Sequence, residues 1–199
     1  MPDYNVIADV SSTLQKVLTT ALKPLDAVSP PIAEISDLQG TISTNPARIT
    51  LFLFEAVEDA SAKNRPRVRV TPPPGPGPAV YMRKPPMALL LRYMITPWSG
   101  DRLTDHKLIG RTLQILYDGA ILSGTQLEGG LAGTDQALKV SLSPLTLEER
   151  ARVWYAIEKP YRLSITYEVR VVNLDAEAVD AIVPVREREL RYVGPETAQ

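Results

Sequence analysis

The sequence predicts an α+β fold, in which a mostly antiparallel sheet of four to five strands is flanked by about three helices. A long Pro-rich loop and a C-terminal arm complete the prediction. Three segments carry apolar residues at steps of three and four, which is typical of amphipathic helices. Four others are either alternately apolar and polar or continuously apolar, which is typical of strands. The 199 residues are 44% hydrophobic and 23% charged, which is enough for one domain to bury a core.

The first half of the chain predicts one helix and two long strands. The helix is expected over residues 5–22, where Pro24 then ends it, and its apolar stripe comprises Ile7, Val10, Leu14, Val17 and Ala21. An irregular stretch follows. Residues 48–57 are apolar on both faces, which predicts a central strand covered on both sides. Residues 87–96 form the second strand and end at a Pro-Trp-Ser-Gly turn.

A second helix is expected over residues 101–117, with Gly119 as its C-cap. We expect its inward face to comprise Leu103, His106, Ile109, Leu113 and Leu116. Gly110 lies in mid-helix, where glycine is unfavourable, and close approach of another backbone would explain it.

The remaining elements alternate between strand and helix. A short strand at 138–142 precedes a helix to about residue 157, which Thr146 and Glu149 begin as a capping box. The inward face of this helix is expected to be Leu147, Ala151 and Trp154. Residues 161–172 alternate six times between apolar and polar, the clearest strand pattern in the chain. Residues 183–193 predict an edge strand or arm.

The net charge of −1 conceals an uneven distribution. Residues 60–100 contain no acidic residue and seven basic ones, and eight of the 18 prolines lie within 60–86. Proline fixes φ and lacks an N–H, so we expect an extended, semi-rigid loop within 60–86. Two interpretations stay open: a solvated basic loop, or a loop that docks on an acidic protein surface. The candidate interface residues are Arg65, Arg67, Arg69, Pro72, Pro73, Pro74, Arg83, Lys84, Arg186, Arg188 and Arg191.

The sequence contains few of the side chains that carry out catalysis or bind metals. Absence of Cys excludes disulfides and thiol nucleophiles, and one His excludes poly-His metal sites. His106 is expected to be a partly buried helix residue. Asp101 and Asp105 are spaced to share a helix face and bind a cation weakly, but they also suit the positive end of the helix dipole.

The other candidate sites are equally weak. The glycines of 129–133 lack the Lys-Ser/Thr of a phosphate loop, and Ser123-Gly124 is no nucleophile elbow. Trp154-Tyr155 fits core packing better than a stacking platform. We therefore expect no enzyme, no cofactor and no metal site. Few aromatics accompany the arginines, so no nucleic-acid partner is expected.

No signal peptide or membrane span is expected either. The N-terminus lacks a basic region before an apolar one, and the longest apolar run, Met87–Leu91, has five residues. The protein is therefore expected to be soluble and made in the cytoplasm.

Several segments in order resemble one family. They are residues 7–14, residues 50–54 followed by Glu55, Asp59 and Asn64, residues 89–97, His106–Gly110 with 113–116, residues 142–149, Val153-Trp154, and residues 160–170. Together they resemble the tail-terminator, or cap, proteins of phage-tail-like contractile injection systems of the anti-feeding-prophage type. The resemblance covers roughly residues 5 to 173.

The resemblance implies a structural role. Family members form a ring, taken to be a hexamer, that ends the inner tube and holds the last layer of contractile sheath. The implied partners are other copies of the chain and the tube and sheath proteins, with cytoplasmic assembly and a particle that is then released. Residues 1–173 would be the terminator-like domain and 174–199 an arm or edge strand. The alternative is a non-enzymatic adaptor that presents its Pro-rich basic loop to a protein partner.

Overall fold

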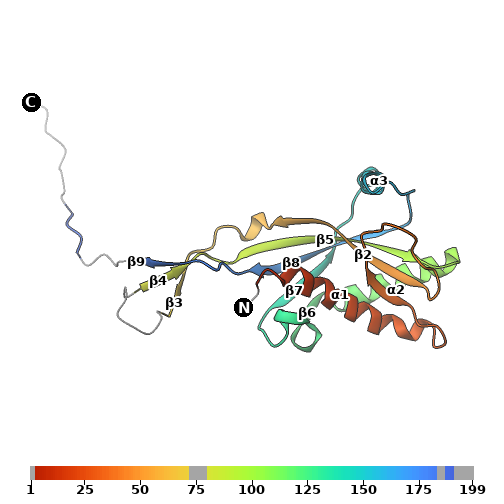
Figure 1. Cartoon of the computed structure of the whole chain (residues 1–199), viewed down its shortest axis with the longest axis horizontal. Coiled ribbons are helices and arrows are strands. Elements are labelled where there is room, and N and C mark those ends of the chain that lie inside the picture. Colours follow the sequence, from red (N-terminus) through yellow and green to blue (C-terminus); the bar gives the residue numbers. More distant parts are fainter. Residues whose placement is uncertain (1–2, 72–79, 183–186, 191–199) are drawn as a thin grey trace, which may run out of the picture. The chain divides into compact units, whose positions relative to one another are not determined.

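The computed structural model describes residues 3–71, 80–182 and 187–190 (Figure 1). The chain divides into two compact units. The main unit comprises Met1–Asn64 and Pro86–Asp175, and the small unit comprises Arg65–Pro85 and Ala176–Gln199.

The main unit is built on a six-stranded sheet in the order β1-β2-β5-β8-β7-β6. Only β1 and β2 are parallel, and the other neighbours are antiparallel. The predicted α+β class is confirmed, with more strands than the four to five expected. The strands are β1 (Ile32–Ile35), β2 (Arg48–Glu58), β5 (Met87–Trp98), β6 (Ile121–Ser123), β7 (Ala137–Leu142) and β8 (Ile165–Leu174).

The described part of the main unit contains three α-helices. Helices α1 (Val6–Leu22) and α2 (Arg102–Asp118) contact each other and one face, and α3 (Leu147–Ala156) lies apart from them (Figure 1). Strand β5 separates two clusters because its side chains alternate between faces. Leu91 and Tyr93 join the main core with α1 and α2, whereas Met94 packs with Leu38 and Trp154 on the other side.

The inward faces of two helices differ from those expected. In α2 the buried residues are Asp105, Leu108, Ile109, Thr112 and Leu116, whereas Leu103 is 68% exposed and His106 is exposed. The apolar pattern misplaced this face because a buried carboxylate, Asp105, occupies part of it. In α3 only Trp154 is buried, and Leu147 and Ala151 are exposed.

Short strands account for the other differences. Strands β1 and β6 have four and three residues, too few for a periodic pattern. The stretch that contains β1 was expected to be irregular, and no element was predicted at β6. Strand β8 begins at Ile165 rather than 161, because residues 161–164 precede the ladder with β5 and β7.

The small unit is a three-stranded antiparallel sheet in the order β3-β4-β9. Strands β3 (Val68–Val70) and β4 (Val80–Arg83) lie in the segment 60–86 expected as a loop. The prolines between them, at 72–78, lie outside the described residues. Strand β9 (Val179–Ile182) precedes the segment 183–193 in which an edge strand was expected. Within that segment, residues 187–190 have no regular structure and the rest lies outside the description.

Candidate protein-interaction surfaces

The small sheet has two unlike faces. Residues paired directly across antiparallel strands point to the same side of a sheet. Arg69, Met82 and Asp180 form one such row, and Val70, Tyr81 and Ala181 form the next row on the opposite side. The face that we call polar comprises three charged residues, Arg67, Arg69 and Asp180, and three apolar ones, Val80, Met82 and Ile182. The face that we call apolar comprises Val68, Val70, Tyr81, Val179 and Ala181, with Arg83 as its one charged residue.

None of the small unit's described residues is buried. On the apolar face, Val68 is 49% exposed and Val179 is 40% exposed. A sheet of three strands needs a hydrophobic face, or packing against a helix, to be stable by itself. Exposed apolar patches rimmed by polar residues are candidates for protein–protein interaction sites, and this face is such a candidate.

The candidate interface residues that the structure describes lie on both faces of the small sheet and outside its strands. Arg67 and Arg69 lie on the polar face, where Arg67 Nη1 donates to Asp180 Oδ2 at 2.8 Å, and Arg83 lies on the apolar face. Arg65, Lys84 and Arg188 are exposed outside the strands. Pro72, Pro73, Pro74, Arg186 and Arg191 lie outside the described residues. Their contribution to an interface stays a prediction.

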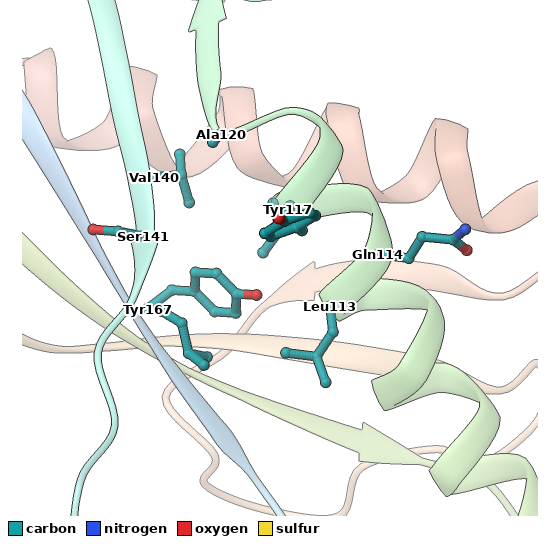
Figure 2. A pocket seen from close by; sticks show the side chains of 9 residues that line it. Leu113, Gln114, Tyr117, Ala120, Val140, Ser141 and Tyr167 are labelled. Carbon is teal, nitrogen blue, oxygen red and sulfur yellow. The ribbon is translucent and has the colours of Figure 1, made fainter.

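The main unit has an apolar groove between the C-terminal half of α2 and strands β7 and β8 (Figure 2). Its volume is about 460 Å³, and its lining is Leu113, Gln114, Leu116, Tyr117, Ala120, Val140, Ser141, Leu142 and Tyr167. Tyr117 is 84% exposed and Leu142 is 51% exposed at its rim. Sequence reasoning missed this groove. The sequence feature that could have indicated this groove is Tyr117, a large aromatic residue that lies outside the buried face of its helix.

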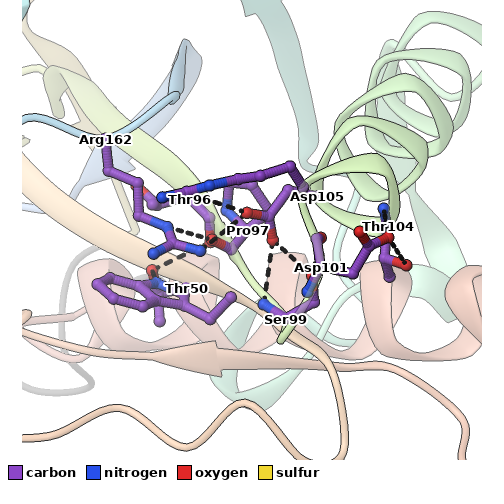
Figure 3. A network of polar contacts seen from close by, with 10 residues as sticks. Thr50, Thr96, Pro97, Ser99, Asp101, Thr104, Asp105 and Arg162 are labelled. Atoms are coloured by element: carbon purple, nitrogen blue, oxygen red, sulfur yellow. Dashed lines mark hydrogen bonds and ion pairs between the residues drawn. The ribbon is translucent and has the colours of Figure 1, made fainter.

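Asp105 and Arg162 form the best-connected polar network of the main unit (Figure 3). Asp105 is 3% exposed, and its carboxylate accepts hydrogen bonds from Ser99 N at 3.0 Å and from Arg162 Nη2 at 2.8 Å. Arg162 also donates to Pro97 O and lies 4.4 Å from the centroid of the Trp98 ring. The network joins α2 to the end of β5.

Asp101 lies at the positive end of α2, as expected, and it is the N-cap residue of this helix. Its side chain accepts a hydrogen bond from Thr104 N at 2.9 Å, and hydrogen bonds from the backbone and hydroxyl of Thr104 lower the pKa of Asp101. Asp105 does more than suit the helix dipole, because it is the buried partner of Arg162. In the part of the chain that the structure describes, no three His, Cys, Asp or Glu residues are grouped to hold a metal ion.

The glycine loop at 129–133 is occupied by a carboxylate of the protein. Gly130 N donates to Asp9 Oδ2 at 3.0 Å, and a Cβ at Gly129 would lie 1.9 Å from Asp9 Oδ1. Gly129 also has a φ of +59°, which favours glycine. The loop therefore binds helix α1 and offers no open phosphate cradle. Trp154 is buried while Tyr155 is 85% exposed, so the pair is no stacking platform.

Comparison with known proteins places this fold in context. A solved structure titled PVC sheath/tube terminator, from an extracellular contractile injection system in the extended state, shares the fold with a TM-score of 0.62 at 18% identity. The match covers 97% of our chain and 65% of the terminator chain. A solved structure of the anti-feeding prophage cap matches with a TM-score of 0.58 at 16% identity. This match covers 93% of our chain and 61% of the cap chain. Our chain thus spans under two thirds of either relative's length.

No curated protein matches the chain. Over its described residues, no helix is both long and apolar enough to cross a membrane. The model of the Pvc16 N-terminal domain matches residues 9–188, which include every helix and strand of the two units except the first residues of α1. The chain therefore belongs to the Pvc16 N-terminal domain family.

Proposed function

We propose that this chain is a structural terminator of a contractile injection particle. Copies of it form a ring, a hexamer, that ends the inner tube and holds the last sheath layer. The fold likeness to a sheath/tube terminator over 97% of the chain carries this proposal, and family membership supports it. The ring is assembled in the cytoplasm and leaves with the particle, and it works by contact rather than by catalysis.

The small sheet supplies a physical reason for assembly. No described residue of its apolar face is buried, and burial of apolar area is worth about 25 cal/mol per Å². In the ring, this face docks on a neighbouring protein surface. The arginines of the polar face stay in water, where their ion pairs contribute little.

Deletion of the gene followed by electron microscopy tests the proposal. Without the terminator we expect overlong or ragged tubes, and re-expression of the intact chain should restore uniform length. Particles of normal length in the deletion strain would refute the terminator role.

Measurement of the oligomeric mass tests the ring. We expect a species near six times 21.9 kDa in concentrated protein or on isolated particles. A chain that stays monomeric at high concentration and never co-purifies with tube or sheath would contradict both the ring and its partners.

A further inference from the structure

A second pocket of the main unit is lined by the segment after β1, the end of β5, the start of α2 and the segment after α3. Its volume is about 460 Å³. Both tryptophans of the chain line it, together with a tyrosine that is 46% exposed. Its charged and aromatic lining residues are Trp98, Arg102, Trp154, Lys159, Tyr161 and Arg162.

The lining of this pocket has an excess of positive charge. It contains three cations and no acidic residue. The buried carboxylate of Asp105 contacts two of the cations, because it accepts a hydrogen bond from Arg162 at 2.8 Å and lies 3.6 Å from Arg102 Nη1 (Figure 3). Three cations and one carboxylate leave two positive charges, so the pocket suits a ligand that carries negative charge.

Arg102 and Lys159 have donors that can bind such a ligand. The side chain of Arg102 is 78% exposed, and its 3.6 Å contact with Asp105 is too long for a hydrogen bond. Lys159 Nζ donates to Gly40 O at 2.9 Å and forms no ion pair with a described residue. A guanidinium has five N–H donors and an ammonium has three, so both side chains have donors left for carboxylate oxygens.

The backbone of one pocket wall favours a peptide as the ligand. Thr41 and Ile42 have no regular structure, and no described residue forms a hydrogen bond with their backbone N–H or C=O groups. The side chain of Ile42 packs with the cluster that contains Trp154, so this wall is held in place. A peptide supplies N–H donors, C=O acceptors and carboxylates together, whereas a phosphate group supplies acceptors alone.

We propose that this pocket binds an acidic segment of a partner protein. Carboxylates of the segment pair with Arg102 and Lys159, and its main chain hydrogen-bonds to the backbone at Thr41. An apolar side chain of the segment packs on Trp98 and Tyr161. The inference goes beyond the proposed function, because the site belongs to a single chain and does not need the ring.

The intrinsic fluorescence of the full chain tests this site, because both of its tryptophans line the pocket. The probes are short capped peptides in which two glutamates flank one leucine at different spacings, and the same peptides with glutamine for glutamate. Inorganic phosphate and ADP are the competing small anions. Arg102→Gln and Lys159→Gln each remove one charge from the pocket. Arg152→Gln is the matched control, since Arg152 is also 78% exposed but does not line the pocket.

We expect at least one glutamate peptide to change the fluorescence saturably and its glutamine counterpart to bind at least tenfold more weakly. Arg102→Gln and Lys159→Gln should each weaken binding about fivefold with an unchanged Tm, and Arg152→Gln should have almost no effect. No response to any peptide, or equal weakening by the control, would overturn the inference and leave the terminator role standing.

Two other results would also overturn the inference. Tighter binding of phosphate or ADP than of every peptide would make the pocket a site for small anions. A fluorescence change that follows protein concentration without peptide, and is lost in Arg102→Gln, would mean that a second copy of the chain fills the pocket.

Discussion

Asp105 shows how one residue can change the face that a helix presents. Helical periodicity alone assigns the inward side of α2 to apolar residues, yet the structure buries this carboxylate at 3% exposure. The burial is tolerable because Arg162 and Ser99 satisfy it. The sequence contains both partners, but they are 57 and six positions away, and nothing in the local pattern joins Arg162 to Asp105.

Removing this carboxylate should be costly. Asp105→Ala leaves Arg162, whose side chain is only 20% exposed, without its anionic partner, so we expect a loss of about 3 kcal/mol in the free energy of unfolding. Urea denaturation measures it. Arg102→Ala is the matched control, since Arg102 lies 3.6 Å from the same carboxylate but is 78% exposed, and its loss should cost under about 0.5 kcal/mol. Equal costs for the two variants would contradict the role given to Arg162.

Gly110 has no packing reason to be glycine. A Cβ at this position would meet no atom within 4 Å, so the close backbone approach expected there is wrong. Gly110→Ala should stabilise the protein by about 0.5–1 kcal/mol, because alanine loses less backbone freedom in a helix. Thermal unfolding should show a higher Tm. Gly129→Ala, which clashes with Asp9, should lower it, and a lower Tm for Gly110→Ala would show that this glycine has another role.

At the scale of elements, the length of a helix or strand determined whether the sequence could predict it. The long helices and strands, such as α1 and β5, have enough residues for a periodic pattern and were predicted within a few positions. Strands β1 and β6 are held by their neighbours in the sheet, a long-range effect that four or three residues do not encode. In the small unit, the many prolines predicted a loop where β3 and β4 lie, although the valines of Val68–Val70 favour a strand.

Helix α3 depends on its capping box, which was predicted from Thr146 and Glu149. The side chain of Glu149 accepts hydrogen bonds from Thr146 N and Oγ1, both at 2.8 Å, and these bonds lower the pKa of Glu149 below its usual 4.5. A carboxyl whose folded pKa is depressed stabilises the fold above its unfolded pKa, and this contribution is lost as pH falls through the folded pKa.

Amide exchange in α3 should therefore be slow at pH 6, after correction for intrinsic rates, and faster below about pH 4. Glu149→Gln keeps the accepting oxygen without the titrating proton, so its corrected exchange in α3 should vary less with pH. The capping pair in α2, Asp101 and Thr104, serves as an internal reference that keeps its own pH dependence in this variant. An unchanged pH profile in Glu149→Gln would assign the effect to other carboxylates.

At the scale of the whole molecule, the described residues leave two surfaces with exposed apolar side chains, one face of the small sheet and the groove of the main unit. The basic, proline-rich segment drew attention to the small unit, and its arginines remain candidate interface residues. Strand pairing shows that Arg69 and Val68 point to opposite faces, a distinction that needs the register with β4. The groove lined by Tyr167 joins α2, β7 and β8, so no single segment carries its pattern.

Two neighbouring substitutions separate the two faces of the small sheet. Val68→Asp puts a carboxylate on the apolar face, and Arg69→Asp puts the same carboxylate on the polar face of the same strand. If the apolar face docks in the ring, Val68→Asp buries an unpaired charge and should weaken assembly more than tenfold, whereas Arg69→Asp should change it little. Analytical ultracentrifugation measures the assembly. Because Val68 is 49% exposed in the single chain, its substitution should leave the Tm of the monomer almost unchanged. The opposite ranking would assign docking to the arginine-bearing face and so to electrostatic attraction by an acidic partner.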